Sequence, residues 1–177
     1  MSRPRFHRRF ARSRRGSAAV EFAIIAPIVL VILGGLYEVG HAFQTLTAVN
    51  ELASQYAISW ADCSDNPAGT CNTEISLYSP SNAIGNVAPQ LTAASVTLQM
   101  FQVTMSGTTP SVTYAYPSGA GLTAAQTTAA QAAFTSGQTG VIVTVNYTYN
   151  VTVFPGVLSG VIPASFPMSF TVTQLKA

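Results

Sequence analysis

Residues 14–37 read RRGSAAVEFAIIAPIVLVILGGLY, two arginines and a glycine followed by a long apolar run. After two arginines and a glycine, Glu21 is the one charged residue within it. The apolar part, residues 18–37, has about the 20 residues that a helix needs to cross a bilayer. The sequence therefore predicts a transmembrane helix close to the N-terminus.

The charges of the chain are few and unevenly placed. Asp, Glu, Lys and Arg make up 8% of the residues, against about 25% in typical soluble domains. Seven of the eight basic residues precede Ser17, all six acids lie between Glu21 and Glu74, and residues 75–175 carry no charged side chain. Because basic residues stay on the cytoplasmic side, we expect a single pass through the inner membrane, a cytoplasmic N-terminus and a periplasmic C-terminal part.

The uncharged distal part argues against several classes of function. General acid–base catalysis draws on His, Asp, Glu, Lys, Tyr or Cys, and residues 75–175 offer only tyrosines from this set. Nucleic-acid binding requires basic side chains that displace counterions. A neutral surface rich in Ser, Thr, Ala and Val associates readily. We therefore expect no enzyme, no cofactor and no nucleic acid, but a protein that packs against partners outside the cytoplasm.

Three kinds of segment combine basic residues with an apolar run. A secretory signal peptide needs a small-residue cleavage site, which Gly40-His41-Ala42 matches poorly. An uncleaved signal anchor fits the length and the charge but leaves Glu21 unexplained, since an ionised carboxylate in a span costs roughly 2.5–3.5 kcal/mol. A prepilin-like leader gives Glu21 a role. The alternative to such a role is that Glu21 lies at the cytoplasmic interface of the membrane and extends its carboxylate toward water.

The string around residue 16 resembles the processing site of TadE-like proteins of the tight-adherence (Tad/Flp) pilus system. The residues that carry the resemblance are Arg14, Arg15, Gly16, Ser17, Glu21 and Phe22. In that family a prepilin peptidase cuts after a glycine that follows basic residues, which implies a cut between Gly16 and Ser17. An acid and an aromatic residue at the fifth and sixth mature positions are typical of Flp-type substrates. Classical type IV pilins favour Phe or Met at the first mature position, where this chain has Ser17. This difference argues against a classical type IV pilin more than against a Tad protein.

The resemblance implies a minor pseudopilin that helps to initiate, cap or support a pilus. The implied partners are the membrane, the prepilin peptidase, sister minor pseudopilins, the major Flp pilin and the inner-membrane assembly platform. Cleavage would free the amine of Ser17, one helical turn from Glu21. We expect Glu21 to pair with this amine or with that of a neighbouring subunit, because pairing offsets the cost of both charges. The sequence leaves open a TadF-like role and an uncleaved, membrane-anchored periplasmic module.

The helical pattern continues beyond the membrane. Phe43, Leu46, Val49, Tyr56 and Trp60 recur at helical spacing, which predicts that one helix enters the distal domain. The pattern predicts three segments: a basic leader at residues 1–16, a transmembrane and periplasmic helix at residues 17–61, and a head at residues 62–177.

Cys63 and Cys71 lie in the loop DCSDNPAGTC, directly after this helix. Cysteines in an extracytoplasmic loop usually pair, so we expect a disulfide, which in a loop this short stabilises by about 2.5 kcal/mol. Calcium binding by Asp62, Asp65 and Glu74 is the alternative use of this loop, since calcium takes oxygen ligands. The spacing of these acids matches no familiar calcium loop, and we expect a solvated acidic loop without a metal.

The head contains one strongly alternating segment, residues 140–154. One face carries Val141, Val143, Val145, Tyr147, Tyr149, Val151 and Val153, and the other carries Thr144, Asn146, Thr148, Asn150 and Thr152. This pattern predicts a half-buried antiparallel strand, with residues 166–172 as the returning strand beside it.

The remaining elements of the head are shorter. Residues 95–105 change phase midway, which indicates a bulge or a strand buried on both faces. Residues 112–116 predict another strand, and residues 122–134 predict a short helix. The fold class is therefore α+β and pilin-like, in which a long N-terminal transmembrane helix continues into a head with an antiparallel β-sheet.

Overall fold

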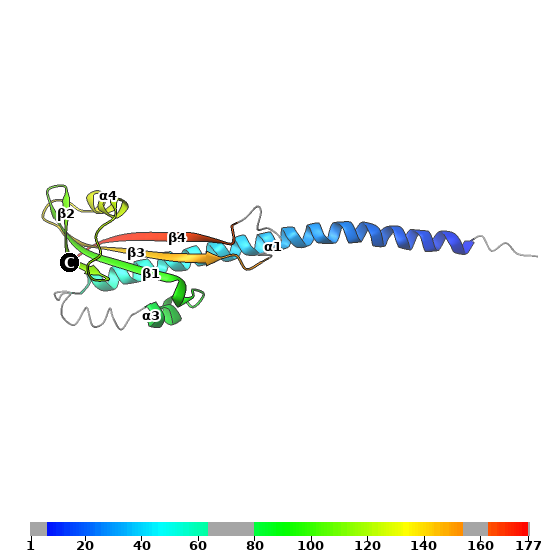
Figure 1. Cartoon of the computed structure of the whole chain (residues 1–177), viewed down its shortest axis with the longest axis horizontal. Coiled ribbons are helices and arrows are strands. Elements are labelled where there is room, and N and C mark those ends of the chain that lie inside the picture. Colours follow the sequence, from blue (N-terminus) through cyan, green and yellow to red (C-terminus); the bar gives the residue numbers. More distant parts are fainter. Residues whose placement is uncertain (1–6, 64–79, 154–162, 177) are drawn as a thin grey trace, which may run out of the picture.

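The computed structural model describes residues 7–63, 80–153 and 163–176, with side chains at residues 16–63, 84–153 and 163–176. Figure 1 shows a long helix whose first half projects alone and whose second half lies along a sheet. The elements are α1 (His7–Ala61), α3 (Pro80–Val87), the 3-10 turn η1 (Ala93–Ser95), β1 (Val96–Ser106), β2 (Thr109–Tyr116), α4 (Ala124–Ala133), β3 (Thr139–Asn150) and β4 (Ser165–Leu175). The predicted α+β architecture is confirmed.

Helix α1 is continuous from the stem into the head. Pro27 lies inside it and does not end it, and helices that cross membranes tolerate such a proline. The second half buries residues at the three- and four-residue spacing of a helix face. Its core residues are Ala48, Val49, Leu52, Ala53, Tyr56, Ala57, Trp60 and Ala61. The predicted extension of the helix to about residue 61 is therefore correct.

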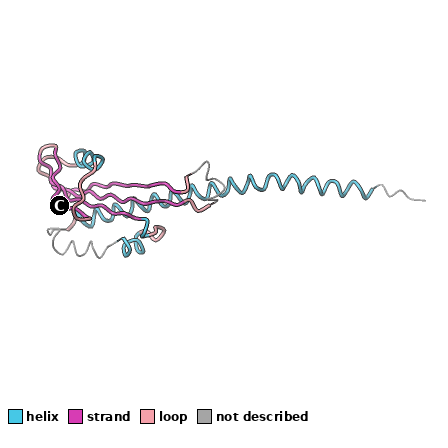
Figure 2. Tube along the Cα trace, in the orientation of Figure 1, coloured by secondary structure: helices cyan, strands magenta, loops and turns pink. Residues whose placement is uncertain are grey.

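The sheet is antiparallel, with strand order β2-β1-β3-β4. Strands β3 and β4 are neighbours, as the sequence predicted, and Val145 of β3 pairs with Phe170 of β4. A tight turn at Gly107, which has a positive φ of 63°, joins β1 to β2, and glycine adopts this conformation without a steric penalty. Figure 2 shows the strands running alongside the second half of α1.

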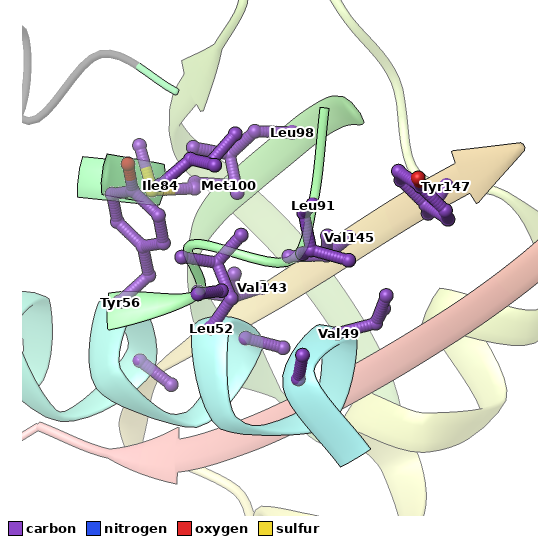
Figure 3. Packing of buried hydrophobic residues seen from close by; sticks show 14 of the residues in the cluster. Val49, Leu52, Tyr56, Ile84, Leu91, Leu98, Met100, Val143, Val145 and Tyr147 are labelled. Carbon is purple, nitrogen blue, oxygen red and sulfur yellow. The ribbon is translucent and has the colours of Figure 1, made fainter. Parts of the chain in front are cut away.

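The main core lies between α1 and the sheet (Figure 3). Leu52 and Tyr56 of α1 meet Met100 of β1 and Val143 of β3, and all four are at most 6% exposed. At the far end of the helix, the ring of Trp60 meets that of Tyr114 edge-on, with centroids 5.3 Å apart. Burial of apolar surface therefore holds the helix against the neighbouring strands β1, β3 and β4.

The other face of the sheet is covered by α4, and the prediction that β3 is half-buried is wrong for its first half. Ile142 and Thr144 point to this face and are 0% and 6% exposed. Ile142 belongs to a second cluster with Phe101, Ala130 and Phe134. A layer from α4 thus turns the start of β3 into a strand buried on both sides.

Two further details of strands β3 and β1 can be compared with the predictions. The alternation predicted that the strand at residues 140–154 extends to Phe154, but β3 ends at Asn150, and Phe154 lies outside the described residues. The phase change in β1 has one of its two predicted causes, burial on both faces, since Met100 and Phe101 are buried on opposite faces. The predicted bulge is not in β1: the register with β2 shifts between Gln102 and Val103 because β2 carries the extra residue, Thr113, and β1 pairs with β3 without a shift.

Candidate anchoring and assembly site

The first half of α1 is an exposed apolar stem, here residues 16–37. Its large exposed side chains are Val20, Phe22, Ile24, Ile25, Ile28, Val29, Leu30, Val31, Ile32, Leu33, Leu36 and Tyr37. Soluble monomers rarely expose so continuous an apolar surface. Within the described residues one helix, Gly16–Ala61, is long and apolar enough to cross a membrane by length and composition. The stem therefore fits a single-pass membrane anchor.

The predicted processing residues lie at the start of this stem. Ser17 and Glu21 share one helix face, where Ser17 Oγ donates a hydrogen bond to Glu21 Oε1 at 3.0 Å. The next residue, Phe22, is 72% exposed. Arg14 and Arg15 continue the helix, but their side chains lie outside the described part of the chain. The geometry brings Ser17 and Glu21 together; processing and recognition by these residues remain predictions.

Gly16 is not required by the local packing. A Cβ added at Gly16 would meet nothing within 4 Å, and the residue lies within regular helix. Glycine in a helix interior costs about 1 kcal/mol relative to alanine. The fold therefore offers no reason for a glycine at this position.

Glu38, at the base of the stem, is the residue that sequence reasoning missed. Its carboxylate accepts hydrogen bonds from the backbone N–H of Thr152 at 3.1 Å and of Val153 at 2.8 Å. It also accepts from Thr152 Oγ1 at 3.2 Å and from the hydroxyl of Tyr149 at 2.6 Å. Such donors stabilise an ionised carboxylate. Glu38 thereby joins α1 to the chain just beyond β3, and its capture of two N–H groups accounts for the early end of that strand.

His41 extends this cluster, which we call the junction (Glu38, His41, Tyr149 and the backbone at residues 152–153). His41 Nδ1 lies 2.9 Å from Tyr149 Oη. The single hydroxyl proton of Tyr149 is directed at Glu38, so His41 must be the donor and carries its proton on Nδ1. The ring of Tyr37 stacks on His41 with centroids 6.1 Å apart. The hydrogen bonds therefore run in one direction, from His41 through Tyr149 to Glu38.

Tyr149 is held in its neutral form. Its side chain is 2% exposed. Burial, followed by the hydrogen bond and the negative charge of Glu38, raises the pKa of Tyr149 well above its ordinary value of 10.0. The phenol therefore remains a donor to Glu38 at neutral pH.

The predicted disulfide falls partly outside the described residues. Cys63 lies just past the end of α1, where its backbone N–H donates to Trp60 O at 3.3 Å, and its side chain packs against the main core. Cys71, Asp65 and Glu74 lie outside the described part. No cluster of three metal-ligating side chains occurs among the described residues. The disulfide remains a prediction.

Together, the exposed stem and the head define a class, an α+β protein in which one N-terminal apolar helix of the described residues fits a single-pass membrane anchor. Comparison adds a partial family match: residues 16–57 match the family model described as TadE-like protein. The TadE resemblance seen in the sequence is thereby confirmed for the segment that contains the stem and the junction residues of α1. TadE-like pilus proteins are structural proteins rather than enzymes. No curated protein and no solved structure matches the chain.

Proposed function

We propose that this protein is a minor pseudopilin that takes part in the assembly of a tight-adherence pilus after a prepilin peptidase cuts between Gly16 and Ser17. The observation that carries the proposal is the match to TadE-like proteins, which begins at Gly16 and covers the stem. The exposed apolar surface of the stem supports it, because that surface needs lipid or other helices to cover it. Residues 1–16 would be the leader, residues 17–61 the anchor helix and residues 62–177 a periplasmic head.

Gly16 supports the position of the cut. The fold does not use the absence of a side chain at this residue, since a Cβ would meet nothing within 4 Å. Recognition by a peptidase explains the glycine, whereas an uncleaved anchor gives no reason for it. Arg14 and Arg15 directly before it would complete the recognised sequence.

Glu21 would then act in assembly. In the uncut chain its carboxylate accepts a hydrogen bond from the hydroxyl of Ser17 at 3.0 Å. Cleavage places a charged amine on the same residue. Glu21 would pair with that amine, or with the amine of the neighbouring subunit, while apolar stems pack side by side. Phe22, directly after it and 72% exposed, would contribute apolar contact to this packing.

The proposal is tested in the host by removing the chain and counting surface pili by electron microscopy. Loss of pili, restored by the wild-type chain but not by Glu21→Ala, is the expected result. Glu51→Ala is the matched control, because Glu51 is an exposed acid on the same helix. Normal pili in the absence of the chain, or full restoration by Glu21→Ala, would contradict the assembly role of the chain or of Glu21, respectively.

A further inference from the structure

The outer edge of β4 carries a further inference. Among the described residues, β4 pairs with β3 on one side and with no strand on the other (Figure 1). Lys176 N donates to Thr139 O at 3.0 Å. Val151 N donates to Ala164 O at 2.9 Å. In an antiparallel pair the bonded residues alternate, so the even-numbered residues of β4 bond to β3 and the odd-numbered residues direct their N–H and C=O groups outward.

Proline divides this edge into two parts. Pro167 occupies an outward position, where its missing N–H costs the ladder nothing. Beyond it, the outward N–H groups belong to Ser169, Thr171, Thr173 and Leu175. We call residues 169–175 the open edge. It is long enough for several backbone hydrogen bonds to an added strand.

No charge protects the open edge. Proteins commonly block a free edge with lysine or another charged residue, yet residues 75–175 contain none. The one lysine nearby, Lys176, reaches across the sheet, and its Nζ donates to Gln102 Oε1 of β1 at 3.3 Å. Its side chain is thus directed over the sheet rather than off the edge.

The opposite edge of the sheet, β2, is protected. Met105 bonds to the chain before β3, so its partner on β2, Pro110, faces outward and lacks an N–H. Pro117 follows the strand, and the pairing of β2 with β1 is irregular at Gln102. Proline and bulges are devices that prevent edge pairing. Among the residues that the structure describes, one edge of the sheet is therefore blocked and the other is left available for pairing.

The direction of β4 restricts what can bind there. Its start, Phe166, pairs with Tyr149 beside the junction, and its end, Leu175, pairs with Gly140 at the far end of the sheet. β4 therefore runs away from the stem. Antiparallel pairing of β4 with β4 of a second copy would point the two stems in opposite directions, which one membrane forbids. Pairing of β4 with the β2 edge of a second copy meets prolines and a bulge.

We propose that the open edge binds an extended, uncharged segment of a different pilin-like subunit, which joins the sheet as an antiparallel fifth strand running toward the membrane. The inference rests on the proposed function for the presence of sister subunits in the same membrane. Phe170 and Val172, both half-buried on the α1 side, select apolar residues at alternate positions of that segment. Ser169 and Thr171, on the other side, select small polar ones.

The test is site-specific photo-cross-linking of the full chain in host membranes. Ser169, which is exposed, is replaced by p-benzoylphenylalanine, which keeps the outward N–H. The expected result is one light-dependent adduct whose partner is a different membrane-anchored pilin-like protein, cross-linked through an uncharged segment. No adduct, an adduct of two copies of this chain, or an adduct through a charged or helical segment overturns the proposal.

Two variants at Thr173 test the role of the backbone. Thr173→Pro removes an outward N–H and leaves the bonds to β3, while Thr173→Val keeps the N–H. We expect the adduct yield to fall about tenfold with Thr173→Pro, the effect of one lost backbone bond and an unpaired carbonyl on the partner, and to remain unchanged with Thr173→Val. Equal yields overturn the proposal. If near-ultraviolet circular dichroism shows that Thr173→Pro is unfolded, Ser169→Pro replaces it, with the cross-linker at Leu175.

The result is separable from the proposed function. Absence of the adduct in cells that process the chain and make pili rejects the open edge alone. An adduct in cells whose pili do not depend on the chain rejects the pilus role and keeps the partner site.

Discussion

The hydroxyl of Tyr149 donates a 2.6 Å hydrogen bond to the carboxylate of Glu38, although the two residues are 111 positions apart in the sequence. Glu38 is the last polar anchor before the stem leaves the head, and Tyr149 is the penultimate residue of β3. The bond therefore joins the base of the apolar stem to the sheet. A rigid connection at this point lets any displacement of the stem move the whole head.

Glu38→Ala should loosen this connection. The variant leaves the N–H groups of Thr152 and Val153 and the hydroxyl of Tyr149 without their acceptor, and we expect a loss of about 1–3 kcal/mol in the free energy of unfolding. Chemical denaturation of the full chain in detergent, followed by near-ultraviolet circular dichroism, measures this loss. Glu51→Ala, on an exposed part of the same helix, should change little. Equal stability of the two variants would show that the junction contributes nothing.

The junction should also make stability fall at high pH. The pKa of Tyr149 is raised in the folded state, so folding favours the protonated phenol. This contribution is complete below the ordinary pKa of 10.0 and is lost as the pH rises above it. We expect the wild-type chain to lose more stability than Tyr149→Phe between about pH 8 and about pH 11. Parallel thermal unfolding curves of the two proteins across this range would contradict the arrangement.

Gly140 should not tolerate alanine. A Cβ at Gly140 would overlap the ring of Phe134, which closes the second core below α4. Overpacking of this kind costs about 1–3 kcal/mol. Gly121→Ala is the control, since a Cβ there meets nothing within 4 Å. Phe134→Leu should recover part of the loss in the double variant, and a Gly140→Ala protein as stable as the control would argue against the packing of α4 on β3.

The second core shows why the sequence predicted only part of the fold. The helix at residues 122–134 was correctly predicted, but its burial on β3 was not, because polar side chains such as Gln126 and Thr144 are typical of solvent-facing positions. In the structure Gln126 Nε2 donates to Thr144 Oγ1 at 3.0 Å and to Gln99 Oε1 at 3.1 Å. These polar side chains satisfy one another between the layers. The alternating pattern of β3 identifies its apolar face. It does not indicate that the polar face is also buried, because paired polar side chains look the same in sequence as exposed ones.

The site was predictable where it depends on local spacing. The four-residue separation of Ser17 and Glu21 alone places them on one helix face. Glu38 was not assigned a role because its partners are more than a hundred residues away, and a single sequence contains no distance between them. The helix α3 was also missed, since eight residues that include Pro80 and Gly85 carry no usable periodicity.

The predicted disulfide should account for both cysteines. Mass spectrometry of the full chain, isolated from cells and alkylated without a reductant, should find Cys63 and Cys71 joined and unmodified. Cys63→Ser and Cys71→Ser should each lower the free energy of unfolding by about 2.5 kcal/mol, and the double variant should lose no more than either one, because both single variants remove the same bond. Alkylation of both thiols would show that the loop is open.

The mass of the mature chain, purified from cells with and without the matching prepilin peptidase, decides whether this protein is processed as a pseudopilin. We expect the peptidase to remove residues 1–16 and to leave Ser17 as the first residue, and we expect the chain to stay uncut in its absence. An uncut chain in both cells, or a cut near Ala42, would contradict processing as a pseudopilin and would remove the role proposed for Glu21.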